Sequence, residues 1–370
     1  MDNRFASRVA ADIMKIVPYR PGKPIEELKR EKGLSRVVKL ASNENPLGPS
    51  PAAVKALKEE GERLNRYPDG YGYELKRALS ELWRVPPEEL ALGNGSSEII
   101  EMMVRLFVRP GTTVVLACPS FSIYAIAVTA QGGRVVDVPL TGHGVDLPAV
   151  AGAVDENTSL VILGNPNNPT GTAFGRAPWE KFLSAIPSDT PVLLDEAYAE
   201  YADGPDSFDG RDYISDTRPL VAARTFSKAY GLALLRLGYA VAPAEIVDYM
   251  NRLRLPFNAN GAAQAAALAA VADRNHLERV VGANREGRER LQTFFAASGV
   301  EFIPSQANFV ATRVGDGDRF FNLMLDEGVI VRSISGFAMP EWIRVSIGTP
   351  GEMEIFEAAF LKVQKLMGAK

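Results

Sequence analysis

The chain has 370 residues, with 41 Lys and Arg against 45 Asp and Glu, which gives a formal net charge of −4. It holds one Cys and two His, too few for an internal disulfide or a Cys/His zinc cluster, so no metal site is predicted. The slightly acidic balance, without runs of Lys or Arg, provides no electrostatic footprint for nucleic acid or an anionic membrane.

The N-terminal segment is interrupted by charges at Asp2, Arg4, Arg8, Asp12 and Lys15. It therefore lacks the uninterrupted apolar stretch of a signal peptide, and a cytoplasmic protein is expected. Residues 1–42 show too little apolar periodicity to fold alone. We expect them to form an arm that packs on a smaller domain or on a partner subunit.

From about residue 70 to residue 255, short apolar runs alternate with segments of helical periodicity. The runs lie at 112–117, 135–138, 160–163, 192–194, 220–223 and 238–242. Strands that are apolar on both faces are typical of a mostly parallel sheet covered by helices. The uncharged stretch 110–133 is long enough to cross a bilayer, but Pro119 and three glycines break it, so we interpret it as a strand, a turn and a buried helix.

After Pro256 the pattern changes to an Ala-rich helix, a long amphipathic helix, and short strand candidates separated by a further helix. The strand candidates lie at 300–303, 308–314, 329–332 and 342–347. This order predicts a smaller α+β domain over 258–370. The predicted fold class is therefore α/β, a mostly parallel central sheet flanked by helices in 43–257, with a smaller α+β domain.

Polar motifs follow three of the predicted strands. They are Gly164-Asn-Pro-Asn-Asn-Pro-Thr-Gly171, Asp195-Glu-Ala-Tyr198 and Arg224-Thr-Phe-Ser-Lys228. Each alone has an ordinary explanation, as a turn, a helix cap or a solvated lysine. Because ligands bind at the carboxyl ends of parallel strands, the three together predict one crevice. An amine, a carboxylate, a phenol and an amide in one crevice are what a pyridoxal 5'-phosphate site requires.

Each of these groups has a chemical reason to be there. The Lys228 amine can hold an aldehyde cofactor as a Schiff base when it is desolvated. A buried carboxylate such as Asp195 favours protonation of the cofactor's ring nitrogen by its opposite charge. Tyr198 and Asn168 can donate hydrogen bonds to the phenolate oxygen of the ring.

Cationic and hydroxyl groups nearby suit the cofactor's phosphate. Arg236 can supply a bidentate contact, and Thr225 and Ser227 can supply hydroxyls. The segment Gly93-Asn-Gly-Ser-Ser-Glu98 places glycines before a helix that begins at Ser96, which is a ready anion site. It lacks the third glycine of a dinucleotide fingerprint, which disfavours a nicotinamide dehydrogenase.

Phe121, after the first strand, is a candidate to stack on the cofactor ring or an ordinary core residue. Cys118 is interpreted as an inert buried thiol. His143 lies in a turn-like string and His276 in a charged helical pattern, so neither is expected to be a placed general base.

A series of ordered motifs resembles the fold-type I pyridoxal-phosphate enzymes and, within them, the histidinol-phosphate aminotransferase family. Besides the three motifs above, the resemblance rests on Pro18-Tyr-Arg-Pro-Gly-Lys-Pro-Ile-Glu-Glu27, Leu40-Ala-Ser-Asn-Glu-Asn-Pro-Leu-Gly48, Arg66-Tyr-Pro-Asp69, Pro304-Ser-Gln-Ala-Asn-Phe309 and Ile343-Arg-Val-Ser-Ile-Gly-Thr349. It runs over nearly the whole chain. It implies ping-pong transfer of an amino group between glutamate/2-oxoglutarate and histidinol phosphate/imidazole acetol phosphate.

The resemblance also implies a role for each site residue. Lys228 holds the cofactor and moves a proton, and Asp195 pairs with the ring nitrogen. Asn168 and Tyr198 pair with the phenolate oxygen, and Phe121 stacks on the ring. The phosphate is held by Ser96, Ser97, Thr225, Ser227 and Arg236. Tyr67 joins them from the second subunit, which implies a homodimer with a shared active site. Arg344 matches the arginine that binds the carboxylate of the amino donor. Arg332 and Tyr19 match positions at the phosphate end of the substrate, and Asn43 is assigned to the substrate site as well.

Two positions depart from the family pattern. Leu234 stands where many relatives have glycine, and Ser97 where an aspartate is often found. On the same scaffold, an aromatic-amino-acid aminotransferase and a threonine-phosphate decarboxylase remain alternatives, because they differ mainly in the substrate pocket. A cofactor-binding module without turnover is disfavoured by the intact set of Lys228, Asp195 and Arg344.

Overall fold

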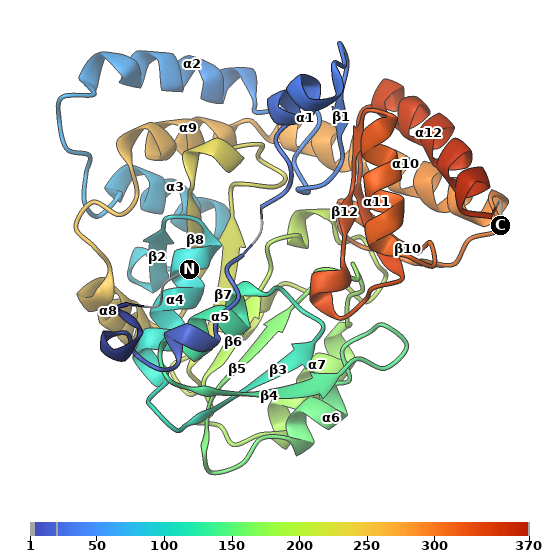
Figure 1. The fold of residues 1–370 in the computed structure, drawn as a ribbon. Helices are drawn as coiled ribbons and strands as arrows, with labels where there is room; N and C mark the ends of the chain where they lie inside the picture. Colours follow the sequence, from blue (N-terminus) through green and yellow to red (C-terminus); the bar gives the residue numbers. More distant parts are fainter. Residues whose placement is uncertain (1–3, 20, 369–370) are drawn as a thin grey trace.

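The computed structural model describes residues 4–19 and 21–368 and is built around one seven-stranded sheet (Figure 1). The strand order is β2-β8-β7-β6-β5-β3-β4. The strands are β2 (Leu90–Gly93), β3 (Thr113–Cys118), β4 (Arg134–Pro139), β5 (Thr158–Gly164), β6 (Val192–Asp195), β7 (Leu220–Thr225) and β8 (Gly238–Val241). In this sheet β8 runs antiparallel to both of its neighbours, and the pairs from β7 to β4 are parallel.

The predicted mostly parallel sheet is therefore confirmed, and each of the six predicted strands is present. The strand β2 was not predicted. It has only four residues and directly follows a 3-10 turn at Pro87–Glu89, so its apolar run is too short to stand out from a loop.

Helices cover both faces of the sheet, because alternate residues of each strand point to opposite sides. They are α2 (Pro51–Glu60), α3 (Tyr73–Trp83), α4 (Ser96–Phe107), α5 (Ile123–Ala130), α6 (Leu147–Gly152), α7 (Arg176–Ala185), α8 (Ala244–Leu253) and α9 (Gly261–Ala272). On β3, Val114 packs with Ile99 and Met103 of α4, whereas Val115 packs with Trp179 of α7 on the other face.

The uncharged stretch 110–133 forms β3 and α5, which confirms the interpretation as strand, turn and buried helix. Among the described residues, no helix combines the length and the apolar character needed to cross a membrane.

The C-terminal part forms a smaller α+β unit beside the large sheet, coloured orange to red in Figure 1. Its elements are α10 (Arg274–Ala297), β9 (Phe302–Ile303), β10 (Phe309–Arg313), α11 (Gly317–Asp326), β11 (Val329–Ile330), β12 (Arg332–Ser333), β13 (Trp342–Ser346) and α12 (Pro350–Gly368). Four strands form an antiparallel sheet in the order β12-β13-β10-β9. Phe295, Phe320, Phe356 and Phe360 fill the space between this sheet and its helices. The predicted strand 329–332 is two short strands that belong to different sheets.

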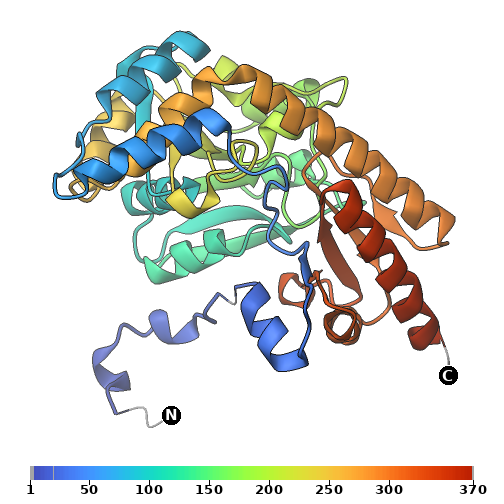
Figure 2. The same cartoon turned by 90° about the horizontal axis from the view of Figure 1, so that it is seen from above.

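The N-terminal arm reaches this smaller unit. Its helix α1 (Ile25–Lys32) and strand β1 (Val38–Lys39) lie against the C-terminal elements in both views (Figures 1 and 2). Strand β1 pairs in parallel with β11, and Leu28 of α1 packs with Leu325 and Ile330. Residues 42–50 then connect the arm to α2. Within this connection, Ser42 and Asn43 lie near the ends of the central strands. The division into 1–42, 43–257 and 258–370 stays a prediction. Arg20, inside the Pro18–Glu27 motif, lies outside the described residues.

Candidate active site

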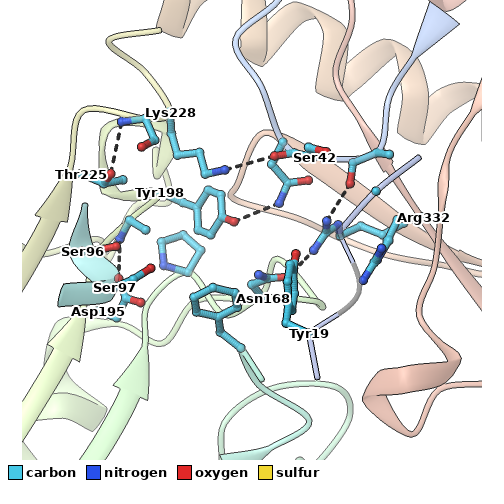
Figure 3. Close-up of a pocket in the computed structure, with 18 of the residues that line it drawn as sticks. Tyr19, Ser42, Ser96, Ser97, Asn168, Asp195, Tyr198, Thr225, Lys228 and Arg332 are labelled. Atoms are coloured by element: carbon cyan, nitrogen blue, oxygen red, sulfur yellow. Dashed lines mark hydrogen bonds between the residues drawn. The ribbon is translucent and has the colours of Figure 1, made fainter. Parts of the chain in front are cut away.

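One cavity lies at the carboxyl ends of the central parallel strands, between the large sheet, the smaller unit and the arm (Figure 3). Every predicted site residue except Tyr67 lines it: Tyr19, Asn43, Ser96, Ser97, Phe121, Asn168, Asp195, Tyr198, Thr225, Ser227, Lys228, Arg236, Arg332 and Arg344. Ser42, Tyr124, Pro166 and Phe337 also line the cavity, and none of these four is among the predicted site residues.

Lys228 follows β7 and is the amine of the cavity. Its Nζ donates a hydrogen bond to the carbonyl oxygen of Ser42 at 3.1 Å (Figure 3). Burial, assisted by the positive charge of Arg344, lowers the pKa of Lys228 to about 8. A substantial fraction of the amine is therefore neutral near physiological pH, which is the form that attacks a carbonyl carbon.

Asp195 is the carboxylate at the end of β6, and only 5% of it is exposed. Its Oδ2 accepts a hydrogen bond from the Tyr124 hydroxyl at 2.7 Å, and its Oδ1 accepts one from the backbone N–H of Ala197 at 3.1 Å. Burial raises the pKa of the Asp195 carboxyl, and the hydrogen bond from Tyr124 is the first of the effects that oppose this rise. Tyr124 lies in the apolar helix α5, where the only signal in the sequence is a phenol three residues after Phe121.

A chain of hydrogen bonds joins the two sides of the cavity. Asn43 Nδ2 donates to the Tyr198 hydroxyl at 2.9 Å, and the Asn43 backbone N–H donates to Ser346 Oγ at 2.8 Å. On β13, Arg344 donates to Asn168 Oδ1 through Nη1 and to the carbonyl oxygen of Ala41 through Nη2.

Arg344 is 6% exposed, and its Nε has no hydrogen-bond partner among the described residues. A buried guanidinium with an unused N–H beside a cavity is suited to bind an anion such as a carboxylate.

At the other end of the cavity, hydroxyls and a guanidinium surround the start of α4. Arg236 Nη1 donates to Ser227 Oγ at 3.2 Å, and Thr225 Oγ1 accepts from the Ser227 N–H at 3.2 Å. Gly95 precedes α4 with φ +75°, and a Cβ there would lie 2.5 Å from Arg236 Nη2. Glycine at this position therefore lets the arginine approach the helix N-terminus, where Ser96 and Ser97 begin the helix. This arrangement suits a phosphate monoester.

Arg332 of β12 and Tyr19 of the arm line the cavity next to each other, with the Arg332 guanidinium 5.8 Å from the Tyr19 ring centroid. Tyr67 lies elsewhere in this protomer. It is 83% exposed and stacks on Phe257, with the ring centroids 4.6 Å apart. Its predicted role at the site of a partner subunit stays a prediction.

Both histidines lie in other surroundings. His143 sits in a turn with its ring edge against Trp342, and His276 Nε2 lies 3.1 Å from the carbonyl oxygen of Gly48. Burial and Asp137 raise the pKa of the Cys118 thiol to about 11, which keeps it protonated and unreactive. In residues 4–19 and 21–368, no group of three or more His, Cys, Asp or Glu is arranged to hold a metal ion.

Comparisons with known proteins agree with this geometry. The family model described as aminotransferase class I and II matches residues 35–360. Histidinol-phosphate aminotransferase 2 of Hydrogenovibrio crunogenus is 45% identical over 361 residues, which cover 97% of each chain. Histidinol-phosphate aminotransferase 1 of Cupriavidus pinatubonensis is 47% identical over 356 residues, which cover 95% of each chain.

A crystal structure of histidinol-phosphate aminotransferase from Sinorhizobium meliloti, in complex with pyridoxal-5'-phosphate, has a similar fold. Its TM-score is 0.89 at 30% sequence identity, with 97% of this chain and 98% of that chain covered. This similarity confirms the fold type that the motifs predict. From the family match over most of its length and the relatives above 40% identity, we conclude that the chain belongs to the class I and II aminotransferase family.

Proposed function

We propose that this chain is a pyridoxal-phosphate-dependent aminotransferase that transfers an amino group from histidinol phosphate to 2-oxoglutarate. The observation that carries the proposal is the convergence of Lys228, Asp195 and Arg344 on one cavity at the ends of the central strands. The relatives that cover almost the whole chain are named for the same activity.

The residues present fit the cofactor in three places. The start of α4, with Arg236 and Gly95, forms a cradle for a dianionic phosphate. Asp195 offers a buried carboxylate to a ring nitrogen, and Lys228 offers an amine with a lowered pKa. When bound, pyridoxal phosphate supplies an electron sink that stabilises negative charge at the substrate Cα. Thr225, Ser227 and Ser96 would complete the phosphate contacts, with Phe121 against the ring.

The chain's own residues then have distinct tasks. The Lys228 amine is partly neutral at pH 7 to 8. It takes a proton from the substrate Cα and delivers it to C4′ of the cofactor. A base with a pKa near the working pH is the efficient choice for such a step. Asn43 and Asn168 orient Tyr198 and Arg344 respectively, through the hydrogen bonds described above.

The two substrates make different demands on the cavity, because glutamate offers carboxylates whereas histidinol phosphate offers a phosphate. Arg344, with its unpartnered Nε, suits the α-carboxylate of glutamate. Arg332, beside Tyr19 in the cavity lining, suits the phosphate of histidinol phosphate, because an arginine fork matches phosphate oxygens. The cavity therefore offers one arginine to each kind of anionic group, Arg344 to a carboxylate and Arg332 to a phosphate.

The test of this proposal is a comparison of kcat/KM for histidinol phosphate, phenylalanine and threonine phosphate with the purified protein. We expect histidinol phosphate to be preferred. A preference for phenylalanine would reassign the chain to the aromatic aminotransferases, and carbon dioxide release from threonine phosphate would reassign it to the decarboxylases. A protein that gains no visible absorption band with added pyridoxal phosphate would refute the cofactor.

We also propose that the protein works as a homodimer with shared active sites. Besides Tyr67, several large apolar side chains of the protomer are exposed: Leu64, Tyr71, Tyr73, Leu234 and Leu255. Leu234, which departs from the family pattern, is 90% exposed, so little of its side chain is covered by the described residues. Exposed apolar groups of this kind mark association surfaces.

Mixed dimers test the shared site. A Lys228→Ala subunit and a Tyr67→Ala subunit are each defective, but a dimer of one of each contains one site with both residues intact. We expect activity to appear on mixing, in a species that sediments as a dimer. An active monomer would disprove the role of Tyr67.

A cytoplasmic location remains a proposal that cell fractionation can check.

A further inference from the structure

Tyr124 is a buried tyrosine that touches two predicted cofactor residues at once. Only 2% of it is exposed. Its hydroxyl donates to Asp195 Oδ2 at 2.7 Å, and its ring meets Phe121 edge-on, with centroids 5.7 Å apart and an interplanar angle of 87°. One side chain of α5 thus contacts both the proposed partner of the ring nitrogen and the proposed stacking residue.

The neighbouring strand leaves space for this contact. Gly164 ends β5, and a Cβ there would lie 3.3 Å from the Tyr124 hydroxyl oxygen. That distance is short for a contact between a Cβ and an oxygen atom, so a side chain at position 164 would require the Tyr124 hydroxyl or the backbone of β5 to shift. The position of the Tyr124 hydroxyl is therefore defined from two sides, by Gly164 and by the carboxylate.

Asp195 has few other partners. Within residues 4–19 and 21–368, no ion pair shorter than 4.0 Å includes Asp195, and its other hydrogen bond comes from the backbone of Ala197. Lys228 and Tyr198 are the further titratable groups that act on Asp195 or Tyr124 through their charge. Tyr124 is thus the side-chain donor that orients this carboxylate. A buried carboxylate without a donor would rotate and lose part of its stabilisation.

We propose that Tyr124 is a positioning residue for the cofactor ring, which fixes the Asp195 carboxylate toward the ring nitrogen and holds Phe121 against the ring face. This inference rests on the proposed function, because it assigns Asp195 to the ring nitrogen of pyridoxal phosphate. Tyr124 acts through Asp195 and needs no contact with the substrate.

Tyr124→Phe tests the hydroxyl, since it removes one oxygen atom and keeps the ring beside Phe121. We expect the Kd of the apoprotein for pyridoxal phosphate to rise by about 10- to 100-fold, the effect of losing a hydrogen bond to a charged group. We expect kcat at saturating cofactor to fall while the KM for glutamate stays within about twofold, because the donor's carboxylate is held elsewhere.

A cofactor analogue separates positioning from general packing. In 1-deazapyridoxal phosphate a carbon atom replaces the ring nitrogen, so Asp195 has no nitrogen to pair with. We expect Tyr124→Phe to change the Kd for this analogue by less than about twofold. Equal losses with both ligands would mean that Tyr124 only supports the packing of the cavity, and the proposal would be wrong.

Two further variants control this experiment. Tyr213→Phe removes a comparable hydrogen bond from a tyrosine to a carboxylate, that of Tyr213 to Glu180 Oε1 at 2.8 Å on α7, and should leave both Kd values unchanged. Gly164→Ala displaces the Tyr124 hydroxyl without altering it and should raise the Kd for pyridoxal phosphate in the same direction. An unchanged Kd for pyridoxal phosphate in Tyr124→Phe would refute the inference alone, whereas wild-type protein that binds no pyridoxal phosphate would refute the proposed function.

Discussion

The two walls of the cavity are built in different ways. On the wall of the large sheet, Asp195 ends β6, and Asn168 and Lys228 follow the ends of β5 and β7. These three strands lie side by side. On the opposite wall, Asn43 directly follows the arm and Arg344 belongs to the smaller unit. The two segments are joined by contacts between residues some 300 positions apart, such as the one from the Asn43 N–H to Ser346 Oγ. A continuous sheet fixes the first wall, whereas docking of separate segments fixes the second.

This difference matches a division of work. Bond-making and proton transfer need groups held to within fractions of an ångström, which a sheet provides. Substrates with different anionic groups need a wall that can adjust to each. We therefore expect substitutions on the sheet wall to lower kcat and substitutions on the docked wall to raise KM.

The largest effect is expected for Lys228→Ala on the sheet wall. Loss of the amine removes both the attachment of the cofactor and the proton carrier, so kcat should fall by roughly 10⁴-fold or more. Sodium borohydride should fix the cofactor to the wild-type chain and not to the variant, as mass spectrometry of the chain can show. Lys181→Ala, at an exposed lysine of α7, is the matched control and should behave as wild type.

A second prediction concerns the stability of the apoprotein. The pKa of Lys228 is lowered to about 8 in the folded chain from the ordinary 10.5, so between these two values the unfolded chain binds a proton that the folded chain does not. Stability therefore rises with pH across this window. Relative to Lys228→Met, which lacks the group, wild-type apoprotein should gain about 3 kcal/mol of unfolding free energy from pH 7.5 to 10.5. Urea titrations of both proteins at several pH values measure this gain, and parallel pH curves would contradict it.

The sheet wall was predictable from the sequence for a simple reason. Apolar runs mark the strands, and parallel strands end at one edge, so Asp195 and Lys228 could be placed together from local patterns alone. The contacts of Tyr124 and Ser42 could not be predicted in this way. Tyr124 is hidden in an apolar helix, and Ser42 takes part through its backbone carbonyl, which carries no sequence signal.

The docked wall was predictable only in part. The resemblance to a family assigned Arg344 and Asn43 to the site, but their partners depend on how the arm and the smaller unit meet the large sheet. Nothing in the local sequence indicates that Arg344 donates to Asn168 and to the carbonyl of Ala41. Strand β1, with two residues, is likewise visible only through its pairing with β11.

A third prediction concerns Arg344→Lys on the docked wall. Lysine keeps the charge but loses the planar fork, so the KM for glutamate should rise by about 10- to 100-fold while kcat changes far less. Steady-state kinetics at varied glutamate measure both constants. Arg290→Lys is the matched control, because Arg290 pairs with Glu357 through two nitrogens outside the cavity and should leave the KM unchanged. A fall in kcat at constant KM in Arg344→Lys would contradict the expectation that substitutions on the docked wall act on KM.

The smallest effect is expected for the histidines, which belong to neither wall. His143 has φ +66° in its turn, a conformation that asparagine tolerates better than most residues. His143→Asn should therefore keep kcat and KM within about twofold of wild type. His276→Gln should also keep its activity, although His276 is 6% exposed and contacts the Gly48 carbonyl, so its unfolding free energy should fall by about 1 kcal/mol. Kinetics and urea titration of both variants separate these outcomes. A drop in kcat of more than tenfold in either variant would show that a histidine takes part in a proton transfer here assigned to Lys228.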